Sequence, residues 1–186
     1  MNHPCSITLN HGVIGNGRVL ALVSPTTHID WLCMPRFDSA SVFGRLLDVE
    51  KGGTFAFHAD CAQVDSRMEY VLNTNVLRTT VTCAEGRFDV YDYAPRIPAG
   101  LGVEAPIEVQ RLIVPREGAA RVRVLFDPKP DYAVDQHPKM VAIPGGLQVG
   151  DGAAALYLRT NCSQKISSRE PDWSLATFLR PTHTWD

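Results

Sequence analysis

Short segments in which apolar and polar residues alternate run through most of this chain, and they constrain its fold more than any other feature. In residues 120–126, two valines and a phenylalanine face one side and two arginines the other, which is typical of a half-buried antiparallel strand. Eight such segments are rich in β-branched and aromatic residues and are bounded by glycine, proline, asparagine or aspartate. The predicted strands are residues 18–23, 29–33, 54–58, 76–83, 87–91, 107–114, 120–126 and 153–159.

The segments between these strands predict turns and very little helix. Ala84-Glu85-Gly86 and Arg116-Glu117-Gly118 are each expected to join two strands as hairpin turns, since each ends in a glycine. Gly15-Asn16-Gly17 lacks the lysine and following helix of a phosphate-binding loop and is interpreted as a tight turn. One helical turn is expected at residues 41–47, capped by Asp38 or Ser39, and another near Thr182 or Thr184. Many short strands with so little helix predict an all-β fold, an antiparallel two-sheet β-sandwich.

Composition excludes some classes of function. The 186 residues fit one domain, and 45% are hydrophobic, enough for a core. Eighteen lysines and arginines against 20 acidic residues give a net charge of −2, which argues against a nucleic-acid partner. No apolar run is long enough to span a membrane, and the first twelve residues do not resemble a secretory signal. We therefore expect a cytoplasmic protein.

The cysteines and histidines predict neither a metal site nor a cofactor. The five cysteines are scattered and odd in number, which favours reduced thiols, with Cys33 and Cys83 as small core residues. No two histidines are spaced as metal ligands on one strand or helix, and no cysteine pair has zinc-site spacing. Any metal site would have to be assembled from distant parts of the chain.

Three pairs of neighbouring aspartates are candidates for acid–base chemistry, because glycosidases use two carboxylates. In a β-sandwich, however, such residues usually end strands or form turns. We therefore favour a structural role over a catalytic one for all three pairs. The pairs are Asp30 with Asp38, Asp89 with Asp92, and Asp131 with Asp135.

The most unusual segment is the loop of residues 31–39, which contains Trp31 and displays Arg36, Phe37 and Asp38 after Pro35. A planar cation, an aromatic face and a carboxylate together can bind sugar hydroxyls. The alternative is that Arg36 and Asp38 pair with each other and only fix the loop.

The same region carries a resemblance to a known family. Ile14-Gly-Asn-Gly-Arg-Val-Leu-Ala-Leu-Val23, followed by Ile29-Asp-Trp-Leu-Cys-Met-Pro-Arg-Phe-Asp-Ser39, resembles the opening of bacterial members of glycoside hydrolase family 15, which are glucoamylase-like, glucodextranase-like and trehalase-like. The likeness continues through segments 70–80, 90–95 and 126–132 and through Arg111 and Gly118. The family often has aspartate where this chain has Asn16, and both residue types form turns.

The resemblance implies that residues 1–180 form an N-terminal β-sandwich of the supersandwich type. Residues 181–186 would begin a linker helix to an (α/α)₆-barrel that this chain lacks. That barrel would hold the two glutamates of an inverting α-glucoside hydrolase of the glucoamylase, glucodextranase or trehalase type. The chain alone is therefore expected to be inactive, with its own catalytic domain as partner and the α-glucoside substrate reached only through the full-length enzyme. An apolar docking face on such a piece would favour self-association, so a homo-oligomer is an open expectation.

Two other functions stay open. A free-standing carbohydrate-binding module would use exposed aromatic residues such as Tyr157, Trp173 and Trp185. A complete hydrolase acting through Asp30 and Asp38 is the third alternative. If the chain is the N-terminal domain of such a hydrolase, its candidate substrate-proximal site is the loop of Trp31, Arg36, Phe37 and Asp38.

Overall fold

The computed structural model describes residues 10–152 and 155–160, together with the backbone of residues 176–181. Sixteen strands and one helical turn lie within this part of the chain. The strands of the first half are β1 (Gly12–Gly15), β2 (Leu20–Val23), β3 (Ile29–Cys33), β4 (Ser41–Phe43), β5 (Thr54–Ala59), β6 (Val64–Tyr70), β7 (Leu77–Cys83) and β8 (Gly86–Tyr93). The remaining elements are β9 (Ile97–Ala99), β10 (Gly102–Glu104), β11 (Val109–Gly118), β12 (Val122–Asp127), α1 (Pro130–Ala133), β13 (Met140–Ile143), β14 (Gly146–Val149), β15 (Leu156–Thr160) and β16 (Ala176–Pro181).

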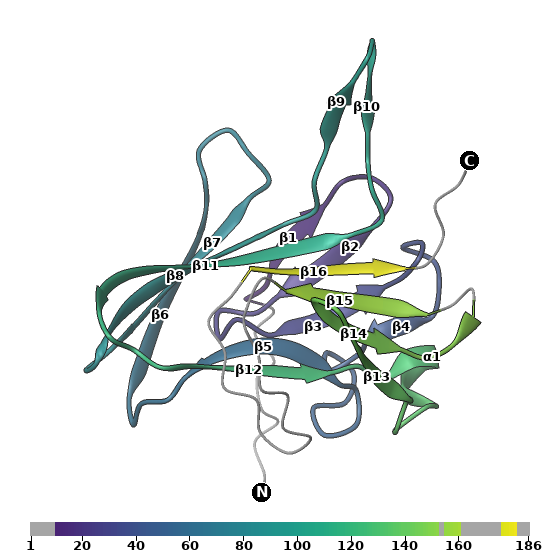
Figure 1. The fold of residues 1–186 in the computed structure, drawn as a ribbon. Helices are drawn as coiled ribbons and strands as arrows, with labels where there is room; N and C mark the ends of the chain where they lie inside the picture. The colour runs from purple at the N-terminus through teal and green to yellow at the C-terminus, as the bar shows by residue number, and fades with distance from the viewer. Residues whose placement is uncertain (1–9, 153–154, 161–175, 182–186) are drawn as a thin grey trace, which may run out of the picture.

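Two large antiparallel sheets face each other, which confirms the predicted β-sandwich (Figure 1). The six-stranded sheet has the order β1-β2-β3-β5-β12, with β4 paired to β3. The eight-stranded sheet has the order β13-β14-β15-β16-β11-β8-β7-β6. Strands β9 and β10 form a separate two-stranded hairpin that projects away from both sheets (Figure 1).

The core forms where the inward faces of the two sheets meet. In the six-stranded sheet, Phe43, Phe55 and Phe126 pack edge to face or tilted, with ring centroids 5.4–6.4 Å apart. The eight-stranded sheet contributes alternate residues of its strands, such as Phe88 and Val90 of β8. The buried residues of both sheets form one hydrophobic cluster, as expected for a sandwich in which every other strand residue points inward.

All eight strands predicted from alternation correspond to observed strands, although Ala153 and Ala154 of the last lie outside the described residues. The helix expected at residues 41–47 is wrong. Ser41, Val42 and Phe43 form strand β4, all three buried, and pair with β3. The helical turn expected near Thr182 or Thr184 lies outside the described residues.

The connection around Arg116-Glu117-Gly118 is also corrected. It is not a hairpin turn, because β11 continues to Gly118 through a bulge and β12 lies in the other sheet. Gly118 has a φ of 68° and lies against the carbonyl of Glu85, so the chain needs a glycine where it leaves one sheet for the other. Ala84-Glu85-Gly86 does join β7 and β8 as predicted.

Candidate functional site

The loop between β3 and β4 places Arg36, Phe37 and Asp38 on the surface. Arg36 donates two hydrogen bonds to Asp38, from Nε to Oδ1 at 2.9 Å and from Nη2 to Oδ2 at 2.8 Å. Ser39 closes the loop, because its Oγ accepts from the Arg36 amide and its own amide donates to the Arg36 carbonyl. The side chains of Arg36 and Asp38 are 71% and 52% exposed, so this pair contributes at most about 1 kcal/mol to stability. The geometry is that of the alternative in which Arg36 and Asp38 pair with each other, and Phe37 between them in sequence is 64% exposed.

Trp31 is separated from these three residues by the end of β3. It is partly buried, pairs with Leu22 of β2 in the sheet register, and lies near Gly44 after β4. The structure therefore brings Arg36, Phe37 and Asp38 together and leaves Trp31 as part of the sheet.

Asp30 is buried and is held by two basic side chains that are distant in sequence. His11 Nε2 lies 2.9 Å from Asp30 Oδ2, and Arg45 Nη1 lies 3.1 Å from Oδ1. The backbone carbonyl of Asp30 also accepts a hydrogen bond from Leu46. Asp30 and Asp38 thus have different partners, and the arrangement fixes the segment after β4 onto β3 instead of presenting two free carboxylates.

A pair of histidines stands near this cluster. The His28 and His58 rings are 4.9 Å apart and nearly perpendicular, and His28 Nδ1 lies 3.3 Å from Thr54 Oγ1. Burial lowers the pKa of His28 to about 4, and the neighbouring charges of Arg45, His58 and Arg111 act in the same direction. Burial also lowers the pKa of His58. Both rings are therefore neutral near pH 7.

Asp89 and Asp92 lie on opposite faces of β8, so they share no site. Asp89 is on the outer face and binds Arg116 at 2.8 Å and Thr80 at 2.8 Å. Asp92 points into the core and receives Arg111 Nε at 2.7 Å and Nη2 at 3.1 Å. The third pair is not a catalytic dyad either, since Asp131 lies in α1 while Asp135 accepts from the His137 amide on the surface.

Arg111 and Asp92 form an ion pair whose side chains are both 0% exposed, between the two sheets. Arg111 comes from the eight-stranded sheet, but its other guanidinium hydrogens bind carbonyls of the opposite sheet and its loop: Nη1 donates to Phe55 and Nη2 to Thr27, both at 2.5 Å. Its Cζ also lies 4.8 and 4.5 Å from the rings of Phe55 and Phe57. A buried guanidinium with this many partners joins the two layers of the sandwich.

Asn16, at the turn between β1 and β2, binds two parts of the chain. Its Oδ1 accepts from the amides of Arg18 and Val19, which forms the predicted turn. Its Nδ2 donates to the carbonyls of Pro95 at 3.0 Å and Pro106 at 2.7 Å, on either side of the β9–β10 hairpin. An ionised aspartate has no side-chain hydrogen to donate, so an aspartate at position 16 could not make these two bonds.

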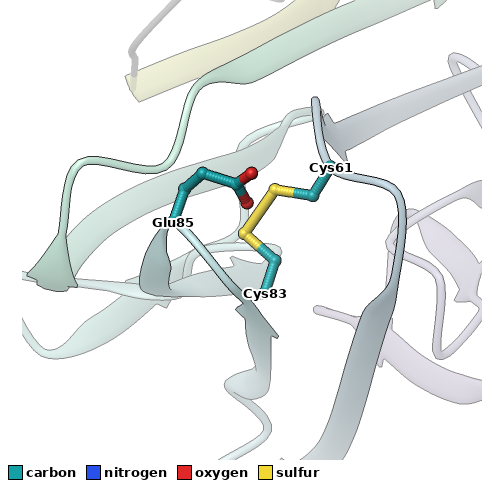
Figure 2. A group of neighbouring side chains, drawn as sticks. All are labelled: Cys61, Cys83 and Glu85. Carbon is teal, nitrogen blue, oxygen red and sulfur yellow. A yellow bond between two sulfur atoms is a disulfide. The ribbon is translucent and has the colours of Figure 1, made fainter.

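Cysteine chemistry differs from the sequence expectation. Cys33 is buried and free, as predicted, but Cys83 forms a disulfide with Cys61. The bond links the segment between β5 and β6 to the end of β7, beside the Glu85 carboxylate (Figure 2). The Cys61 and Cys83 sulfurs and a Glu85 oxygen all lie within 4.8 Å of one another and form a possible metal-binding group among the described residues. Metals bind thiolates, so the disulfide removes two of these three ligands.

Sequence reasoning missed the buried ion pair, although a signal for it existed. In the alternation of β11, Arg111 falls between Val109 and Ile113 on the apolar face, and Asp92 falls on the same face of β8 as Val90. Two opposite charges on the inward faces of two strands predict a buried pair once those strands are known to be neighbours. The disulfide, the histidine pair and the Asp30 cluster had no such signal, because their members come from distant segments.

Within this two-sheet β-sandwich, the buried aspartates Asp30, Asp89 and Asp92 each bind basic or hydroxyl side chains, and the buried Glu108 accepts a hydrogen bond from the Gln110 side-chain amide. Fold and site together define an all-β sandwich domain. Comparison with known proteins gives the family: residues 5–171 match the trehalase-like, N-terminal domain family, and the chain belongs to it. The family assignment confirms the trehalase-like resemblance seen in the sequence.

Several trehalases are similar to parts of this chain. The trehalase of Thermoplasma volcanium is 47% identical over 70 residues, which is 37% of this chain and 11% of that protein. Trehalase 1 of Sulfolobus acidocaldarius is 38% identical over 104 residues, 56% of this chain and 17% of that protein. The trehalase of Mycobacterium tuberculosis is 30% identical over 80 residues, 43% of this chain and 12% of that protein. The chain thus spans less than a fifth of these relatives, and no solved structure gives a significant match.

Proposed function

We propose that this chain is the non-catalytic N-terminal domain of an inverting α-glucoside hydrolase, of the trehalase, glucoamylase or glucodextranase type. The observation that carries the proposal is the family match over residues 5–171, combined with relatives that are named trehalases and are several times longer. The ion pairs that Asp30, Asp89 and Asp92 form with basic side chains support the proposal, because a general acid or base must be free to exchange a proton with substrate. Under this proposal residues 1–180 are the domain, and residues 181–186 begin the linker to a catalytic barrel.

The first test compares the 186-residue chain with the longer enzyme that carries it. Glucose release from trehalose, maltooligosaccharides and dextran-type substrates is expected from the longer enzyme alone. Glucose released by the 186 residues and abolished by Asp30→Asn would refute the proposal in favour of a complete hydrolase.

In the same proposal, the loop of Arg36, Phe37 and Asp38 lies near the substrate entrance of the catalytic domain. Because the Arg36–Asp38 pair is exposed, Arg36→Ala and Asp38→Ala should lower turnover in the longer enzyme while changing the melting temperature little. Lys139 and Asp151 form a matched control, since they are also an exposed pair, 67% exposed each. If the loop variants turn over substrate as fast as the control variants do, the loop has only a scaffolding role.

The alternative of a carbohydrate-binding module is tested by calorimetric titration of the 186 residues with trehalose, maltose and isomaltooligosaccharides. Tyr157 of β15 is partly buried and has the Arg159 guanidinium 5.8 Å from its ring centre, while Trp173 and Trp185 lie outside the described residues. Measurable binding by the isolated chain would favour the module. The absence of binding would favour the structural role.

Cytoplasmic location is part of the proposal, and the cysteines supply its test. Among the described residues no helix is long and apolar enough to cross a membrane. A Cys61–Cys83 disulfide is typical of oxidising compartments in most organisms, whereas a cytoplasmic protein is expected to keep both thiols reduced. Alkylation of thiols during cell lysis, followed by mass spectrometry, distinguishes the two states.

A further inference from the structure

The β9–β10 hairpin has an apolar surface that the other described residues leave uncovered. In the part of the chain that the structure describes, its two strands pair with each other and with no strand of either sheet. The four apolar side chains Ile97, Pro98, Leu101 and Val103 are all exposed, and Leu101 at the turn is the most exposed of the large hydrophobic residues. No charged residue lies between Ile97 and Val103, while Arg96 and Glu104 stand at the two edges of this stretch.

A two-stranded hairpin without a sheet or helix to pack on is marginally stable in water. Apolar side chains concentrated on such a projection normally mark an interaction site. From Pro95 to Gly100 the arm reaches about 16 Å at the usual rise of a strand, which is long enough to enter a groove on another domain.

The base of the hairpin is fixed although its tip is free. Asn16 Nδ2 donates to the carbonyls of Pro95 and Pro106, one on each side of the arm. Because the segments before β9 and after β10 are both bonded to the buried Asn16 side chain, the arm projects in a defined direction from the sandwich (Figure 1). A preoriented arm loses less conformational freedom when it binds than a free loop does.

The register of the eight-stranded sheet indicates which partner lies beside the hairpin. The hairpin leads directly into β11, and Val109 at the start of β11 pairs with Leu179 of β16. Strand β16 therefore ends, at Pro181, beside the start of β11, where the chain leaves the hairpin (Figure 1). In the longer trehalases more than four fifths of the polypeptide lies outside the matched stretch, and in an N-terminal domain this polypeptide follows β16.

We infer that the β9–β10 hairpin is the docking arm of this domain, with Leu101 and its apolar neighbours inserted into an apolar groove of the catalytic domain that follows. The inference rests on the proposed function. It adds the contact surface, the chemistry of the groove, and the expectation that Arg96 and Glu104 meet opposite charges at the groove's rim.

The test compares hydrogen exchange in the 186-residue chain and in the longer enzyme. Amides of residues 97–104 should exchange at least about tenfold more slowly in the longer enzyme. The turn between β6 and β7 is the internal control, because Leu72 is also strongly exposed and should exchange equally in both. Unchanged exchange of the hairpin in an active longer enzyme would overturn the inference and leave the proposed function standing.

A matched pair of variants separates docking from folding. Leu101→Asp and Leu72→Asp should each leave the melting temperature of the 186-residue chain unchanged, since both side chains are exposed. In the longer enzyme, only Leu101→Asp should lower the melting temperature, by about 3 °C or more, and restore fast exchange at residues 97–104. If Leu101→Asp instead dissociates an oligomer of the longer enzyme and leaves its domains in contact, the arm binds a second copy and the inference is wrong.

Discussion

Replacing Arg111 by methionine tests the central physical claim about this fold, that the buried Arg111 guanidinium, paired with Asp92 of its own sheet, joins the two sheets through the carbonyls of Phe55 and Thr27. Methionine keeps much of the volume of the side chain and removes the charge. The variant leaves the Asp92 carboxylate, 0% exposed, without its cation and leaves the carbonyls of Phe55 and Thr27 without a donor.

The expected loss follows from these contacts. Removing one partner of a buried ion pair costs about 3–5 kcal/mol, because the remaining charge stays buried without compensation. A domain of this size is stable by about 5–15 kcal/mol in total, so Arg111→Met should remove a large fraction of the free energy of unfolding. The double variant Arg111→Met/Asp92→Leu removes both charges. Its loss in the free energy of unfolding should be smaller, by about 2 kcal/mol or more, than the summed losses of the two single variants.

Urea unfolding followed by tryptophan fluorescence measures these differences, with the exposed pair Lys139–Asp151 as the control for an ion pair in solvent. Lys139→Met should change the free energy of unfolding by less than about 1 kcal/mol. If Arg111→Met loses as little stability as Lys139→Met, or if the effects of the Arg111 and Asp92 variants are additive, the buried pair contributes no more than an exposed one and the reasoning fails.

Three further predictions concern pH, thiols and the hairpin base. Folding lowers the pKa of His28 from 6.5 to about 4, so the unfolded chain binds more protons between these two pH values. The free energy of unfolding should therefore be highest above pH 6.5 and fall by up to about 3 kcal/mol as the pH falls toward 4. The His28→Gln variant should flatten that part of a pH–stability curve, and an unchanged slope would contradict the burial argument. The Cys61–Cys83 bond spans 22 residues, so reduction should cost about 3 kcal/mol and lower the melting temperature by about 6–12 °C; a Cys61→Ser/Cys83→Ser protein should not respond to dithiothreitol. Asn16→Asp should lose about 1–3 kcal/mol at pH 7, since its amide hydrogens serve two proline carbonyls, and less at pH 3, where a protonated carboxyl can donate; equal stability of Asn16→Asp and wild type at pH 7 would show that these bonds contribute nothing.

The sequence by itself determined the fold class, because period-two alternation depends only on neighbours along the chain. The strands around Leu77–Cys83 and Gly86–Tyr93 were readable for this reason, as was the hairpin turn between them. Strand β6 (Val64–Tyr70) was missed because it is an edge strand, mostly polar and little buried, so its pattern differs little from that of a loop. The helix expected at residues 41–47 failed because three buried residues are too few to set a period, and pairing with β3 decided their conformation.

The tertiary structure alone decided which distant segments meet. Alternation places Arg111 and Asp92 on inward faces, but only the order of strands in the eight-stranded sheet makes β8 and β11 neighbours and brings the two charges together. The same holds for Cys61 with Cys83 and for His28 with His58, whose partners lie 22 and 30 residues apart. Local sequence fixes the face on which a strand residue lies, whereas long-range pairing between strands fixes what that face touches.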